Sequence, residues 1–262
     1  MIFSTDFSPL LEDFDKSERL TMAAILKYFE NAGSSHSDAA GDSAIKVSET
    51  LGVAWVLTDW KVCVKEFPRY GQKIKVETWI EGLVSPFGTS RNYYLYADGN
   101  LAVEGTSKWV RFDIRAGRPI KVEADLLDRY GPEPDKKVFG GEKLAKISLP
   151  EAFEAETKIH LRCSDFDFNN HVHNLNYYDF ALEAIPTGTV ARPESTAQEN
   201  SSQDQKAAAP FKNARISYKT ALKEGDNAVA KYALVQNEGS DAKHVAAIFS
   251  DAGALACAVE LW

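Results

Sequence analysis

The sequence predicts an α+β protein made of two similar halves, each with one long helix packed against an antiparallel sheet. Three observations predict this class: a helical segment near residue 20 is followed by strands of period two, the same order returns in the second half, and a short motif recurs at a fixed spacing. With 262 residues, of which 44% are hydrophobic, the chain is long enough to bury the cores of two domains.

The first half begins with a helix and continues with strands. Residues 20–33, LTMAAILKYFENAG, place apolar side chains at helical spacing and end in glycine, which predicts a helix that stops there. From residue 55 onward, WVLTDWKVCVKEF, QKIKVETWIEG and SRNYYLYADGNLAVEGTSKWVRFDI are rich in β-branched and aromatic residues. The pair Asp98 and Gly99 is a hairpin-turn signal, so these segments predict antiparallel strands.

The second half repeats this order after a break. The proline-containing stretch 128–137 interrupts the strand pattern, so we expect one domain at 1–137 and a second at 138–262. A strand-like segment at 155–167 is followed by a helical one at 174–185 and by alternating segments from residue 214 onward. Between them, residues 187–210 have no periodicity and a Ser/Gln/Ala bias, which predicts a long mobile loop.

A repeated motif supports the two-copy interpretation. The tripeptide Asp-Phe-Asp that begins at Asp13 returns at Asp165, an offset of 152 residues, and Gly71 and Gly225 mark matching turns at an offset of 154. The copies nevertheless differ where polar chemistry is concentrated. Within 165–180, DFDFNNHVHNLNYYDF, the second half has Asn169 and His171 where the first has a serine and an arginine. We therefore expect the chemistry in the second half and ligand binding in the first.

Residues 167–177, DFNNHVHNLNY, resemble the D-x-N-x-H-V-N-N-x-x-Y motif of the acyl-acyl-carrier-protein (acyl-ACP) thioesterases, the double hotdog enzymes that release fatty acids in plants and many bacteria. Segments 26–36, 51–57, 71–79 and 107–113 resemble the family's first domain in order and spacing. The resemblance implies a tandem hotdog fold whose first half binds the acyl chain. It also implies hydrolysis of fatty acyl-ACP thioesters to free fatty acids in fatty acid biosynthesis.

The family's active site carries over to Asp167, Asn169 and His171. Hydrolysis of a thioester needs an activated water or nucleophile, and a histidine has a pKa near operating pH. On this interpretation the aspartate orients the imidazole and the asparagine positions the water or the thioester. Backbone N–H groups at the start of the helix, from Val172, His173 and Asn174, would then stabilise the oxyanion.

Two positions depart from the family pattern. His173 stands where the family has asparagine, and Ala221 stands where a family segment carries a catalytic glutamate. Three explanations stay open: Asp167 with His171 suffices, Glu224 is recruited instead, or hydrolysis is slow. The missing carboxylate also keeps two other functions open, a non-hydrolytic acyl-binding or acyl-sensing protein and an acyl-CoA thioesterase.

Charge and composition limit the partners. A net charge of −8 argues against nucleic acid, and the absence of a long apolar run or a basic leader argues against membrane insertion and for a cytoplasmic protein. A basic stretch at 108–121 is either a solvated strand edge or a contact for acidic ACP. Its cations are Lys108, Arg111, Arg115, Arg118 and Lys121.

Metals, cofactors and disulfides are not expected. The three cysteines lie far apart without CxxC spacing, and Asp167, His171 and His173 lack a further cluster of metal ligands. Because the chain contains both copies of the repeated unit, we expect either a monomer or a homodimer.

Overall fold

The computed structural model describes residues 1–186, 210–236 and 241–262, and its two halves share one series of a strand, a 3₁₀ turn, a helix and four further strands, to which the first half adds a second helix and a two-residue strand. The first half contains β1 (Phe3–Phe7), the 3₁₀ turn η1 (Leu11–Asp13), α1 (Met22–Ala39), α2 (Ala44–Leu51), β2 (Val53–Val64), β3 (Ile74–Ser85), β4 (Gly88–Ala97), β5 (Asn100–Asp113) and β6 (Arg118–Pro119). The connecting segment contains α3 (Ala124–Asp128) and η2 (Val138–Gly141). The second half contains β7 (Ala155–Ile159), η3 (Cys163–Asp165), α4 (Asn176–Ala184), β8 (Asn213–Tyr218), β9 (Ala228–Val235), β10 (Lys243–Ser250) and β11 (Leu255–Leu261).

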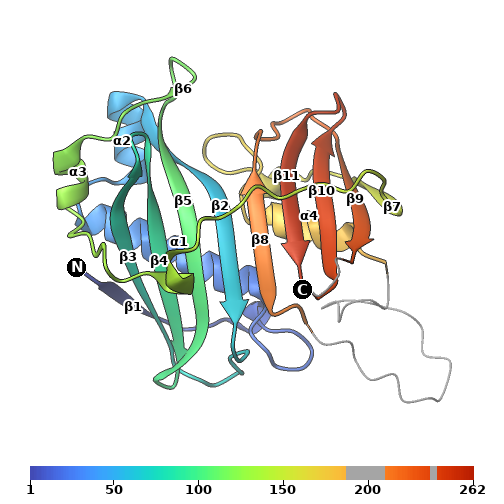
Figure 1. Ribbon diagram of the computed structural model, residues 1–262, viewed down its shortest axis with the longest axis horizontal. Coiled ribbons are helices and arrows are strands. Elements are labelled where there is room, and N and C mark those ends of the chain that lie inside the picture. The colour runs from blue at the N-terminus through green and yellow to red at the C-terminus, as the bar shows by residue number, and fades with distance from the viewer. Residues whose placement is uncertain (187–209, 237–240) are drawn as a thin grey trace.

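The two halves join into one continuous sheet (Figure 1). Within the described residues the strand order is β1-β3-β4-β5-β2-β8-β11-β10-β9-β7, with β6 paired to β5, so the second half repeats the strand order of the first in mirror sequence. Every strand pairing is antiparallel, and β2 pairs with β8 at the centre, where Trp60 lies opposite Ile216. The two predicted helix-and-sheet units are therefore confirmed, and they meet edge to edge at β2 and β8.

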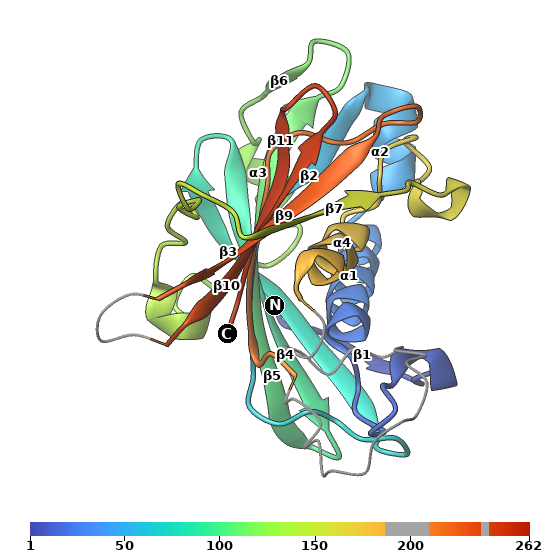
Figure 2. The same cartoon turned by 90° about the vertical axis from the view of Figure 1, so that its right-hand side faces the viewer.

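Both long helices lie on the same face of the sheet (Figures 1 and 2). They pack a core in which Phe29 of α1, Ala181 of α4 and Trp60 of β2 are fully buried. This burial follows from the sequence pattern, because the apolar residues of each helix recur on one side and those of each strand alternate.

The first helix does not end where the sequence predicts. The prediction of a stop at Gly33 is wrong, because α1 continues to Ala39. A Cβ atom at position 33 would lie 3.2 Å from the Tyr93 hydroxyl and 3.3 Å from Cδ of Arg91. This glycine therefore serves close packing of α1 on β4 rather than helix termination.

The connecting segment crosses the opposite face of the sheet (Figure 1). There the Leu144 carbonyl accepts from Lys108 Nζ at 3.3 Å, and the Ala145 carbonyl accepts from Arg215 Nη2 at 2.8 Å. The domain boundary expected after residue 137 falls in this segment, between β6 and β7. Of the loop expected at 187–210, residues 187–209 lie outside the described residues. No helix within the described residues is long and apolar enough to cross a membrane.

Candidate active site

The loop that carries the predicted site is a tight turn closed by the side chain of Asp167. Its Oδ1 atom accepts hydrogen bonds from the backbone N–H groups of Asn169 (2.8 Å) and His171 (3.1 Å). The Asp167 N–H in turn donates to the His171 carbonyl at 2.8 Å, and Asn170 takes the left-handed conformation with φ 59°. Asp167 therefore contacts the backbone of the turn, and no hydrogen bond joins it to the imidazole of His171 among the described residues, contrary to the orienting role expected for it.

The turn presents Asn169 to the other half of the molecule. Phe168 and Asn169 line a cavity of about 70 Å³ whose remaining walls come from Asp42, α2, β2 and Arg111 of the first half. Asn169 is exposed, whereas His171 is half-buried, and its backbone forms an isolated antiparallel β-bridge with Lys223. The site is thus formed between the halves, with its motif on one side and the first half's helix α2 on the other.

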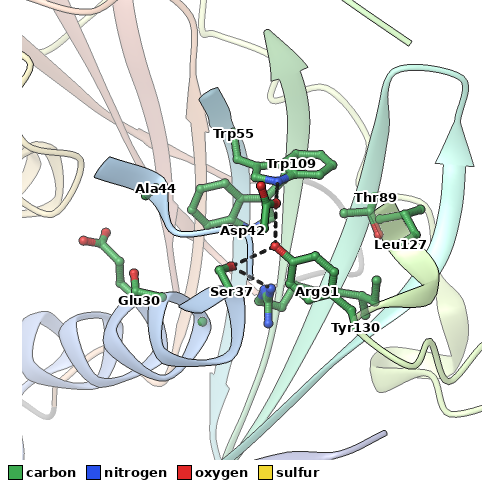
Figure 3. A pocket seen from close by; sticks show the side chains of 13 residues that line it. Glu30, Ser37, Asp42, Ala44, Trp55, Thr89, Arg91, Trp109, Leu127 and Tyr130 are labelled. Carbon is green, nitrogen blue, oxygen red and sulfur yellow. Dashed lines mark hydrogen bonds between the residues drawn. The ribbon is translucent and has the colours of Figure 1, made fainter. Parts of the chain in front are cut away.

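A second cavity, of about 80 Å³, lies within the first half (Figure 3). It shares Asp42, Ala44 and Trp55 with the cavity that Asn169 lines, so the two adjoin. Its lining residues come from α1, α2, α3 and the strands of the first half: Glu30, Gly33, Ser34, Ser37, Asp42, Ala44, Trp55, Ile80, Thr89, Arg91, Trp109, Leu127 and Tyr130. Trp55 and Trp109 line this cavity, whereas Trp60 and Trp79 are completely buried.

One wall of this cavity is a buried polar network around Asp42. Its Oδ2 atom accepts from Trp55 Nε1 and from the Tyr130 hydroxyl, both at 2.7 Å (Figure 3), and its Oδ1 atom lies 3.4 Å from Arg111 Nη1. Both carboxylate oxygens of Asp42 are therefore occupied. Because the phenol is buried and faces this carboxylate, the pKa of Tyr130 is raised well above its usual value.

Arg91 and His36 form a second polar contact at this wall. Arg91 Nη1 lies 2.9 Å from His36 Nδ1, which must be the acceptor because a guanidinium has no lone pair to offer. Burial, followed by the nearby guanidinium charge, lowers the pKa of His36 to about 4. His36 is therefore neutral at physiological pH, and the positive charge at this end of the cavity belongs to Arg91.

The N–H groups expected to form an oxyanion hole are largely occupied. Val172 N–H donates to the Leu222 carbonyl at 2.9 Å, and His173 N–H donates to the Asp165 carbonyl at 2.8 Å. The helix α4 begins only at Asn176. Of the three groups expected, only the N–H of Asn174 has no acceptor among the described residues, so a hole made by all three is ruled out by their internal hydrogen bonds.

An ion pair that the sequence reasoning missed joins the two halves beside the turn. His173 Nε2 lies 2.9 Å from Oε1 of Glu30, a residue of α1 that also lines the first-half cavity. The hydrogen bond that His173 donates to Glu30 raises the pKa of His173, burial lowers it, and the charges of Glu30 and Asp167 raise it further, with a net rise. The departure of His173 from the family pattern was the signal that could have pointed to such a partner.

The carboxylate missing at Ala221 is not replaced by Glu224. Ala221 is exposed, and Glu224 accepts a hydrogen bond from Asn170 Nδ2 at 3.3 Å on the exposed side of the turn. Asn170 is not among the residues that line the cavity of its neighbour Asn169. The part of the chain that the structure describes also holds no group of three or more His, Cys, Asp or Glu side chains that could bind a metal ion.

The five cations of the basic stretch have different environments. Arg111 is only 7% exposed, pairs with Asp42 and stacks over Trp55, so the expectation that it contacts a partner is wrong. Lys108 is half-buried and donates to the Leu144 carbonyl. The other three, Arg115, Arg118 and Lys121, are exposed. They surround the β5–β6 turn, which is bonded to the end of α2 through Ile114 N–H and the Gly52 carbonyl.

Comparison with known sequences finds relatives of both halves. Residues 1–130 match the acyl-ACP thioesterase N-terminal domain, and residues 150–251 match the acyl-ACP thioesterase C-terminal domain. Oleoyl-acyl carrier protein thioesterase 1 (chloroplastic) of Arabidopsis thaliana is 27% identical over 182 residues, which cover 63% of this chain and 50% of the plant protein. Dodecanoyl-[acyl-carrier-protein] hydrolase of Cinnamomum camphora is 24% identical over 200 residues, which cover 71% and 51%. The chain spans about half the length of the curated relatives it matches.

Solved structures share the fold over the whole chain. An acyl-ACP thioesterase from Bacteroides thetaiotaomicron superimposes with a TM-score of 0.78 at 18% identity, covering 99% of this chain and 96% of the other. A 12:0-ACP thioesterase from Umbellularia californica gives 0.78 at 16% identity, with coverage of 99% and 96%. Together with the two helix-and-sheet units, this likeness confirms the tandem hotdog fold.

Proposed function

Because the chain belongs to the acyl-ACP thioesterase family, we propose that it hydrolyses fatty acyl-ACP thioesters and so releases free fatty acids in fatty acid biosynthesis. The observation that carries this proposal is the position of Asn169. This motif residue of the second half lines a cavity walled by the first half, and that cavity adjoins the first-half cavity. A thioester held at the turn could therefore extend its acyl chain into the first half.

Much of the surface of the first-half cavity is apolar, as an acyl chain requires. Ile80, Leu127, Trp55 and Trp109 supply apolar walls, and burial of each methylene against such walls contributes roughly 0.8 kcal/mol. The aromatic rings are held in place by hydrogen bonds, since Trp109 Nε1 donates to Ser107 Oγ at 2.7 Å. The first half would thus bind the chain in a preformed pocket.

The chemistry would fall to the turn of the second half. Asp167 fixes the backbone of the turn, and it thereby fixes the backbone positions from which the side chains of Asn169 and His171 project. The Asn169 amide would position the thioester or the attacking water, and His171 would carry the proton transfer that hydrolysis needs. Asn174 N–H is the remaining backbone donor for the oxyanion.

Three exposed cations would contact the carrier. Arg115, Arg118 and Lys121 lie at the end of the molecule where α2 meets the β5–β6 turn, and α2 also walls the cavity that Asn169 lines. ACP is strongly acidic, so these charges would steer it toward the cavity mouth. Replacing all three with alanine should raise KM for acyl-ACP and leave KM for acyl-CoA nearly unchanged.

The proposal extends to location and assembly. A cytoplasmic location is supported by the three cysteines, all of which are free. One chain contains both halves of the site, so a monomer would be sufficient for activity, and light scattering would distinguish it from a homodimer.

The test is a substrate panel. Purified protein is incubated with acyl-ACP and acyl-CoA of increasing chain length, and the free fatty acid is measured. We expect release from acyl-ACP. Release from acyl-CoA alone would make the protein an acyl-CoA thioesterase, and retention of an acyl group with no release from any thioester would favour the acyl-binding function that the loss at Ala221 suggests.

A further inference from the structure

Glu30 lies where the two halves of the molecule meet. It belongs to α1 of the first half, yet its Oε1 atom is 2.9 Å from Nε2 of His173, which follows the turn of the second half. The side chain of Glu30 is 21% exposed, and that of His173 is 35% exposed. The contact therefore fixes one carboxylate oxygen of the first half against the loop that carries the predicted site.

The other oxygen of this carboxylate faces no protein donor. Glu30 Oε2 is buried and has no hydrogen-bond partner among the described residues, although a buried carboxylate oxygen is costly to leave unpaired. Glu30 also lines the first-half cavity that adjoins the one lined by Asn169. The free oxygen is thus available to a hydrogen-bond donor that enters with the substrate.

The other carboxylates near the site are already engaged. Asp42, which lines both cavities, receives hydrogen bonds on both of its oxygens. Asp167 holds the backbone of the turn, and Glu224 pairs with Asn170 on the exposed side. Glu30 is the carboxylate that combines a place in the cavity wall with an unpaired oxygen.

We propose that Glu30 is a catalytic carboxylate of this site, replacing the one missing at Ala221, and that His173 is its positioning residue. This inference rests on the proposed thioester hydrolysis. It makes the site a composite, with a base from the first half and the turn of Asp167, Asn169 and His171 from the second.

The reaction would run through one water molecule. Its O–H bond breaks as its oxygen bonds to the thioester carbonyl carbon, the proton passes to Glu30 Oε2, and the C=O pair moves onto the oxygen. The oxyanion then re-forms C=O, and the C–S bond breaks with its electron pair on sulfur. Protonated His171 gives its proton to that sulfur. Proton exchange through solvent from Glu30 to His171 restores both groups, so thioester and water become carboxylic acid and thiol.

Glu30→Gln tests the carboxylate itself, because it keeps the shape of the side chain. On the best acyl-ACP of the panel we expect kcat to fall about 100-fold or more, with KM within threefold and only a small fall in melting temperature. The matched control is Glu49→Gln, which changes an exposed glutamate on α2 and should leave kcat unchanged. A kcat within threefold of wild type, or a loss of kcat that accompanies a large fall in melting temperature, would overturn the catalytic role.

Two further readouts separate catalysis from packing. In Glu30→Gln the pKa of His173, followed by NMR of its ring protons, should fall from its raised value, because the Glu30 hydrogen bond is the largest cause of the rise. Adding Ala221→Glu to Glu30→Gln should recover at least tenfold in kcat, since it returns a carboxylate to the family's position at an exposed site. A double variant no faster than Glu30→Gln would overturn the claim of replacement.

Failure of this inference and failure of the proposed function look different. If the wild-type protein releases no fatty acid from any thioester, the proposed hydrolysis is wrong. If the wild type hydrolyses acyl-ACP and Glu30→Gln has the same kcat, the proposed hydrolysis is supported and only the catalytic role of Glu30 is wrong.

Discussion

The two halves of the molecule build the same turn from different side chains. In the first half, Asp15 Oδ1 accepts from the N–H groups of Ser17 (2.8 Å) and Arg19 (3.0 Å). In the second half, Asp167 accepts from the corresponding residues, Asn169 and His171, at 2.8 and 3.1 Å. Even the left-handed residue recurs, since Glu18 and Asn170 both have φ 59°. The backbone scaffold is therefore common to both copies.

The two turns differ in whether their polar side chains are free to bind a ligand. Arg19 Nε closes the first turn on itself with an ion pair to Asp15 Oδ2 at 3.0 Å. In the second turn, no hydrogen bond to the His171 imidazole is found among the described residues, and Asn169 faces a cavity. The fold therefore supplies the same turn in both halves, and the residues at two positions leave polar groups free of partners in the second turn, to which the proposed function assigns the chemistry.

The largest expected effect comes from removing the second half's imidazole. His171→Ala should lower kcat by about 10² to 10⁴ and change KM little, because the lost interaction belongs to proton transfer in the transition state. Arg19→Ala, at the matching position, should keep kcat within twofold. Steady-state kinetics on acyl-ACP compare the two. Equal activity of His171→Ala and wild type would remove the chemical distinction between the halves.

The aspartates of the two turns allow a sharper comparison. Asp167→Asn and Asp15→Asn each weaken two charge-assisted hydrogen bonds to backbone N–H groups, so each should cost about 1 kcal/mol of unfolding free energy, and Asp15→Asn somewhat more because it also removes the ion pair with Arg19. Only Asp167→Asn should also lower kcat, by about 10 to 100-fold, because it loosens the turn that holds Asn169 and His171. Denaturant unfolding and kinetics on both variants give the measurement. A similar kcat loss in both would mean that the turns act through overall stability.

The fold and the common turn were predictable because their causes are local in sequence. The period-two segments gave the strands, and the repeat of Asp13 at Asp165 gave the two copies, which the structure reproduces as matching buried aspartates. The end of α1 was missed because Gly33 reads as a stop, while its actual role depends on contact with Tyr93, sixty residues away.

The parts of the site that sequence reasoning missed depend on distant pairs. Arg111 looks like one more cation of a basic stretch, and only its contact with Asp42 shows that it is buried. Glu30 lies on a helix 143 residues before His173, and no spacing rule brings them together. The oxyanion expectation failed for a similar reason, because Leu222 takes the Val172 N–H.

Filling the first half's cavity should change specificity more than rate. Ala44 is the first residue of α2 and lines both adjoining cavities. Ala44→Leu should therefore shift the substrate preference several-fold toward shorter acyl chains, with only a small change in kcat/KM for the shortest acyl-ACP. Ala39→Leu, at the exposed end of α1, is the matched control. The ratio of kcat/KM across the chain-length panel is the measurement. An unchanged ratio would mean that the acyl chain does not enter this cavity.

The smallest expected effect is on the pH dependence of stability. The folded-state pKa of His173 is raised above its usual value of 6.5, so its pair with Glu30 stabilises the folded state fully below pH 6.5 and loses this contribution as the pH rises through the raised pKa. Glu30→Gln should therefore lower the unfolding free energy by about 0.5 kcal/mol near pH 6, after allowance for solvent screening, and by less near pH 9. Denaturant unfolding at the two pH values checks this. A larger loss at pH 9 would contradict the assigned pair.

The central claim is that the first half binds the acyl chain and the second half carries the chemistry. Locating the bound acyl chain tests this claim most directly. ACP carrying a non-hydrolysable acyl thioether with a diazirine near the chain end is bound to the protein, irradiated, and the labelled peptides are identified by mass spectrometry. The account predicts labelling of peptides that line the first-half cavity, around Trp55, Leu127 and Tyr130. Labelling confined to α4 and β9–β11 of the second half would contradict it.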